Sequence, residues 1–177
     1  MVALIFTSCH SNSSDCCDGP ESEYHYTSYK KYDYNPYFEI EPAQECSRVT
    51  GKPILIMFTG FGCLSITGID WEILAEKDVK KIVDDNYILP VLYVDDKTKI
   101  EEIDSTKKTH NGEIITTIGQ RNATLQVNKF GTIGQPYYFF VDSNLTKIVE
   151  PLGYSLLKEK DIFISRLKEG MINPPRP

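Results

Sequence analysis

Phe58-Thr59-Gly60-Phe61-Gly62-Cys63-Leu64-Ser65-Ile66 is the stretch of sequence that decides the fold. The apolar run before it, residues 53–57, predicts a strand that is covered on both faces. After it, apolar residues recur at helical spacing from Ser65 to Asp84. A cysteine at a strand-to-helix turn is a candidate reactive thiol, because backbone N–H groups and the helix dipole favour the thiolate. The common dithiol motif has a second cysteine three residues on, whereas this chain has Ile66.

Length and composition predict a globular domain with a substantial core. The chain has 177 residues, of which 41% are hydrophobic and 25% charged. A net charge of −6 argues against a nucleic-acid partner. The cysteine spacing and the scattered histidines predict no metal and no cofactor. Asp95-Asp96 hints at a cation, but the alternative, a solvated strand end, is favoured.

The first nine residues form a pattern of their own. Met1 to Phe6 is apolar, and Thr7-Ser8-Cys9 follows, which resembles the end of a bacterial lipoprotein signal. The apolar stretch is shorter than the usual ~7–15 residues, and no basic residues precede it. The alternative is a disordered N-terminus with a spare cysteine. We expect lipidation of Cys9 to anchor the protein in the cell envelope, as a periplasmic or outer-membrane lipoprotein.

Three regions are expected along the chain. Residues 1–35 form a signal remnant and a disordered tether, residues 36–172 form the domain, and residues 173–177 form a tail. Residues 24–34 are dense in tyrosine, which fits either a partner-binding surface or a segment that packs on its own domain. We favour the second interpretation.

The domain shows an alternation of strand and helix patterns. The expected strands are 37–40, 54–59, 87–94, 136–141 and 147–152, of which the last two form a hairpin. Helices are expected at 42–50, with Cys46 buried, at 65–84 with an interruption near 76–78, at 120–130 and at 156–170. Residues 97–111 are polar and charged, so they predict a surface insertion.

This order of elements, with a cysteine at the first strand-to-helix turn, resembles the thioredoxin fold. Over residues 43–170 the chain is most similar to bacterial envelope thioredoxin-like proteins, including the periplasmic C-terminal domain of the transmembrane disulfide reductase. The resemblance implies an α/β fold with a central mixed sheet flanked by helices. The matching blocks are Gly51-Lys52-Pro53, residues 58–63, Leu92-Tyr93-Val94-Asp95-Asp96, Thr117-Ile118-Gly119 and Gln135-Pro136-Tyr137-Tyr138.

The resemblance also implies roles for individual residues. Cys63 matches the attacking cysteine, and Pro136 matches a cis-proline that would present the backbone of Gln135 to a substrate. From the residues alone, Pro136 could equally be a trans proline that begins a strand. The substrate groove would be formed by Phe61, Gly62, Leu64, Ile66, Trp71, Gln135 and Pro136.

Two departures from the family pattern bear on the chemistry. Ile66 replaces the resolving cysteine, and Met57 stands where the family has a buried aspartate. We therefore expect a degenerate site in which Cys63 exchanges with protein thiols or disulfides, or with small thiols, and an external thiol releases the product. The alternative is a non-catalytic binding module that uses the groove near Cys63 and Pro136. A dimer linked through Cys63 is a minor third hypothesis.

Overall fold

The computed structural model describes residues 33–61, 69–156 and 159–172. Its centre is a four-stranded sheet in the order β2-β1-β3-β4. Strand β1 (Ile54–Thr59) runs parallel to β2 (Val91–Tyr93) and antiparallel to β3 (Tyr137–Val141). Strand β3 pairs with antiparallel β4 (Lys147–Gly153). The predicted α/β class with a central mixed sheet is confirmed.

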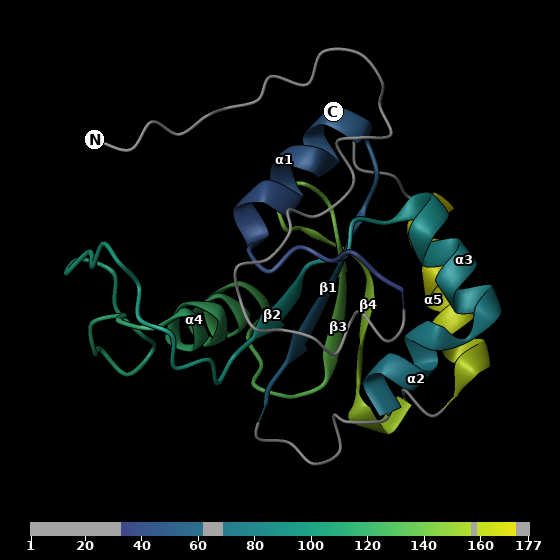
Figure 1. The fold of residues 1–177 in the computed structure, drawn as a ribbon. Coiled ribbons are helices and arrows are strands. Elements are labelled where there is room, and N and C mark those ends of the chain that lie inside the picture. The colour runs from purple at the N-terminus through teal and green to yellow at the C-terminus, as the bar shows by residue number, and fades with distance from the viewer. Residues whose placement is uncertain (1–32, 62–68, 157–158, 173–177) are drawn as a thin grey trace.

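Helices cover both faces of this sheet (Figure 1). One face carries α1 (Ile40–Thr50) and α4 (Ile118–Phe130), and the other carries α2 (Ile69–Ala75), α3 (Lys77–Asn86) and α5 (Lys160–Ile172). Successive side chains of β1 point to opposite faces, so Phe58 joins the cluster under α1 and α4, whereas Met57 joins the other. All six residues of β1 are buried, which accounts for its apolar run.

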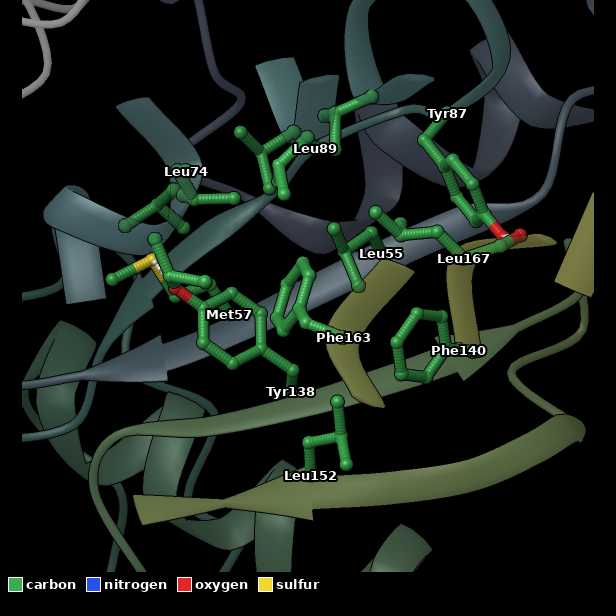
Figure 2. Packing of buried hydrophobic residues seen from close by; sticks show 14 of the residues in the cluster. Leu55, Met57, Leu74, Tyr87, Leu89, Tyr138, Phe140, Leu152, Phe163 and Leu167 are labelled. Carbon is green, nitrogen blue, oxygen red and sulfur yellow. Dashed lines mark hydrogen bonds between the residues drawn. The ribbon is translucent and has the colours of Figure 1, made fainter. Parts of the chain in front are cut away.

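Aromatic rings pack among aliphatic side chains in the core under α2, α3 and α5 (Figure 2). The Tyr138 and Phe163 rings meet edge to face, with centroids 5.1 Å apart. The Tyr87 hydroxyl donates a hydrogen bond of 2.6 Å to the carbonyl oxygen of Leu167. Burial raises the pKa of Tyr87 above its usual value, so the phenol is neutral and ties α5 to the chain before β2.

Two predicted elements are shorter than their sequence patterns suggest. The helix expected over 65–84 is divided into α2 and α3 at Glu76, whose ψ of 124° is not helical, and this agrees with the interruption predicted near 76–78. Residues 65–68 lie outside the described residues. The strand expected over 87–94 is reduced to β2. Pro90 offers no N–H to a neighbouring strand, and before it only an isolated bridge joins Ile88 to Ile54.

The described residues just before α1 pack on their own domain. Instead of the strand predicted over 37–40, Tyr37 alone forms a bridge with Pro90, and α1 begins at Ile40, two residues earlier than expected. Tyr34 is buried, and its hydroxyl donates to the carbonyl oxygen of Leu74 at 2.7 Å. Tyr34, the last residue of the tyrosine-rich segment, fits the interpretation that this segment packs on its own domain; residues 24–32 lie outside the described residues.

The remaining differences concern helix ends. Helix α4 begins at Ile118 because Thr117 and Gln120 form a reciprocal capping box. Residues Tyr154–Leu156 form a short 3₁₀ turn, η2, and α5 begins only at Lys160.

Cys46 is buried on α1, as predicted. Among the described helices, none is both long and apolar enough to cross a bilayer.

Candidate functional site

The structure describes part of the predicted site. Cys63, Gly62, Leu64 and Ile66 lie outside the described residues, as does Cys9, and the side chain of Trp71 is likewise not described. The predicted residues that are described, Phe61, Gln135 and Pro136, all lie at one end of the sheet, where β1 ends and β3 begins.

Asp95 fixes the turn that follows β1. Its Oδ1 atom accepts a hydrogen bond of 2.8 Å from the backbone N–H of Phe61. The Phe61 ring stacks on the ring of Tyr93 at a centroid distance of 4.4 Å and an interplanar angle of 20°. Phe61 nevertheless remains 58% exposed. Two contacts from the end of β2 therefore position the backbone two residues before Cys63.

Gly60 allows three segments to meet at this turn. A Cβ atom placed on Gly60 would lie 2.6 Å from Oε1 of Gln135 and 3.0 Å from Cγ of Asp95. The first distance is shorter than van der Waals contact permits, so a side chain at this position would displace its neighbours. Glycine is favoured here by the close approach of the Gln135 and Asp95 side chains and not by a positive φ, which Gly60 does not have.

The peptide bond between Gln135 and Pro136 is cis. Because Phe58 pairs with Tyr137, the antiparallel register places Pro136 beside the end of β1. Pro136 is buried and Gln135 is half-buried. The structure thus brings Gln135 and Pro136 next to the turn that leads to Cys63.

Beneath this turn, β1 carries the buried side chain of Met57 where the family pattern has an aspartate. The Met57 and Tyr138 side chains are both fully buried, and the Tyr138 hydroxyl lies 3.5 Å from the Met57 sulfur (Figure 2). Thr59 lies two residues further along the same face of β1. Within the described structure its hydroxyl oxygen is buried without a hydrogen-bond partner. Neutral groups therefore occupy these two positions on β1.

The contacts of Asp95 and Asp96 are what the sequence interpretation missed at this end of the sheet. Both accept backbone hydrogen bonds, so the solvated strand end predicted there is wrong. Asp96 is only 5% exposed, and its Oδ1 accepts from the N–H of Thr98 at 2.7 Å. The block of residues 92–96 was the available signal, but it could not show which backbone N–H these carboxylates would meet. In the described ranges, no cluster of His, Cys, Asp and Glu is arranged to hold a metal ion.

Exposed apolar side chains lie in the segments next to the strand ends at this end of the sheet. Ile133 is 71% exposed just before β3, and Tyr154 is 41% exposed just after β4. Since Gly153 pairs with Tyr137, the end of β4 lies beside the start of β3. Together with Phe61 these residues give the site an apolar rim.

Comparison with solved structures gives the fold its name. The chain resembles "DsbH Oxidoreductase" with a TM-score of 0.52 and 17% identity, over 85% of this chain and 94% of that one. A disulphide isomerase from Xylella fastidiosa Temecula1 aligns with a TM-score of 0.48 and 16% identity, over 84% and 96% of the two chains. No family model matches the sequence, and no curated protein matches it. The chain has the thioredoxin-like fold.

Proposed function

We propose that this protein exchanges thiols and disulfides through the single thiol of Cys63. The observation that carries the proposal is the convergence of Asp95, Gly60 and the Gln135–Pro136 bond on the turn that leads to Cys63. The shared fold with an oxidoreductase supports it.

The proposed reaction takes two steps. The Cys63 thiolate attacks one sulfur of a disulfide, so that the substrate's S–S bond breaks, a mixed disulfide forms on Cys63 and the other sulfur leaves as a thiolate. A second thiol, protein-borne or small, then attacks the mixed disulfide and releases Cys63. The external thiol is needed because Ile66 offers no sulfur and Met57 offers no carboxylate to accept a proton.

The test is the reactivity of Cys63 as the only thiol in the chain. Cys9, Cys16 and Cys17 are changed to Ser, and Cys46→Ala is used because Cys46 is buried. Iodoacetamide alkylation is followed against pH, with Cys63→Ser as the control. We expect a thiolate pKa well below ~8.5 and a mixed disulfide with a cysteine-containing peptide in intact mass spectra. An unshifted thiol that traps no peptide would sink the exchange proposal.

That negative result would favour the alternative, a non-catalytic binding module. The exposed apolar rim formed by Phe61, Ile133 and Tyr154 is the observation in its favour. The variant Ile66→Cys separates the two further. If the scaffold is competent, this variant reduces insulin disulfides with dithiothreitol as electron donor faster than its parent.

We also propose that the protein resides in the cell envelope, anchored by a lipid on Cys9. The Thr7-Ser8-Cys9 pattern supports this proposal. Expression in a Gram-negative host with radiolabelled palmitate should label the full chain and not the Cys9→Ser variant. Equal labelling of both would refute lipidation at Cys9.

A further inference from the structure

Helix α4 carries two buried amide side chains that lie one turn apart. Asn122 is 3% exposed and Gln126 is 1% exposed. Because residues four apart are neighbours on the surface of a helix, the two amides lie on the same face of α4. A buried amide is costly unless it is hydrogen-bonded, so the groups that these side chains bind indicate what the pair does.

The first amide holds the end of β2. Nδ2 of Asn122 donates a hydrogen bond of 2.9 Å to the carbonyl oxygen of Tyr93, the last residue of that strand. At the start of α4, the N–H of Gly119 donates to the carbonyl oxygen of Asp96, also at 2.9 Å. The short segment from Tyr93 to Asp96 is therefore bound to α4 at both of its ends.

This segment contacts the turn that follows β1. The Tyr93 ring stacks on the ring of Phe61, and Oδ1 of Asp95 accepts the hydrogen bond of the Phe61 N–H. Both contacts start from residues that the two bonds to α4 hold in place. The position of Phe61 therefore depends on where α4 fixes the end of β2.

The second amide holds the segment on the other side of the same turn. Nε2 of Gln126 donates a hydrogen bond of 2.8 Å to the carbonyl oxygen of Gly134. The next residue, Gln135, approaches Gly60 so closely that a Cβ atom placed there would lie 2.6 Å from its Oε1 atom. A displacement of Gly134 would therefore change the space that surrounds Gly60.

We propose that Asn122 and Gln126 are positioning residues for the turn at Gly60 and Phe61. One face of α4 sets the distance between the two segments that enclose this turn, the end of β2 and the chain before β3. Since both amides are buried, they act through the backbone carbonyls that they bind and not by contact with a substrate. This inference rests on the proposed exchange function of Cys63 and adds two residues that influence it through the turn.

The experiment compares Gln126→Met with Gln44→Met in the full chain with Cys63 as its only thiol. Methionine has nearly the length of glutamine but no amide group, so each variant loses a hydrogen bond and keeps its packing. Gln44 is the matched control, because its Nε2 atom also donates at 2.8 Å to a loop carbonyl, that of Ser143. Ser143 follows the end of β3 that is remote from Gly134.

Three measurements are made on each variant and on Asn122→Leu, which removes the other amide. The melting temperature gives the general cost of the lost bond. The amide proton shift of Phe61 in NMR spectra reports its hydrogen bond to Asp95, because a carboxylate acceptor moves an amide proton downfield. The pH profile of iodoacetamide alkylation reports the thiolate fraction of Cys63.

We expect Gln126→Met and Gln44→Met to lose roughly 2–4 °C each in melting temperature, the effect of one hydrogen bond. Only Gln126→Met should move the Phe61 amide proton upfield and slow the alkylation of Cys63 at pH 6, by roughly threefold. Asn122→Leu should change the same two readouts in the same direction. If either test variant fails to fold, the other one decides.

An unchanged Phe61 shift and an unchanged Cys63 profile in the folded test variants would overturn the proposal. So would an equal change in Gln44→Met, since that result would show a general loss of stability. The exchange function fails separately, through a parent chain whose Cys63 has an unshifted thiol and traps no cysteine-containing peptide. In that case the Phe61 shift still decides whether the two amides position the turn.

Discussion

Removing the carboxylate of Asp95 should loosen the turn before Cys63. The N–H of Phe61 donates to Asp95 Oδ1 at 2.8 Å, and hydrogen bonds to charged groups contribute about 1.5–3 kcal/mol. Because Phe61 is 58% exposed, water can replace the lost acceptor. We therefore expect Asp95→Ala to cost about 1.5 kcal/mol, near the lower end of that range.

A loss of this size corresponds to a fall in melting temperature of roughly 3–6 °C for a chain of this length. The assay is thermal unfolding by circular dichroism, together with the alkylation rate of Cys63 in the single-thiol background. Asp95→Asn, which keeps an oxygen acceptor, should lose about half as much. If Asp95→Ala melts within about 1 °C of its parent and Cys63 reacts at the same rate, the positioning role of Asp95 is refuted.

Three further substitutions test the packing around the site. Gly60→Ala should lower the free energy of unfolding in urea by about 1–3 kcal/mol through overpacking. Adding Gln135→Ala should recover part of this loss, because the atom nearest to the new Cβ belongs to Gln135. No recovery in the double variant would contradict this account. Tyr87→Phe should cost about 1 kcal/mol at pH 7, through the bond to Leu167. Burial raises the pKa of Tyr87 in the folded state. Above the unfolded-state pKa of about 10, the folded wild type therefore binds more protons than the unfolded chain, and its free energy of unfolding falls as pH rises. A difference in unfolding free energy between wild type and Tyr87→Phe that does not narrow above that pH would contradict this. Phe163→Ala should lower the free energy of unfolding by about 3–5 kcal/mol, since Phe163 is fully buried. A loss below about 1 kcal/mol would show that Phe163 does not pack in the core under α5.

Much of the fold follows from patterns that are local in sequence. The buried run at 54–59 predicts β1 to the residue, since a strand covered on both faces is apolar throughout. The end of α1 can also be predicted from local sequence. Gly51 follows the helix with a φ of 70°, a backbone conformation that favours glycine. The sequence pattern alone could not predict that the strand expected at 87–94 is limited to β2. That limit depends on the segment beside which Pro90 lies in the folded protein.

The candidate site divides in the same way. The sequence by itself singled out Cys63 and the absence of a partner thiol at Ile66, because strand, turn and helix signals are read from consecutive residues. Only the tertiary structure could bring Asp95 to the N–H of Phe61, thirty-four residues away, and Gln135 against Gly60. Nor could spacing show that residues 109–111 lie close to α4. Those contacts arise when the strands pack side by side and bring their ends together at one end of the sheet. The order of residues along the chain does not give the distances between such segments.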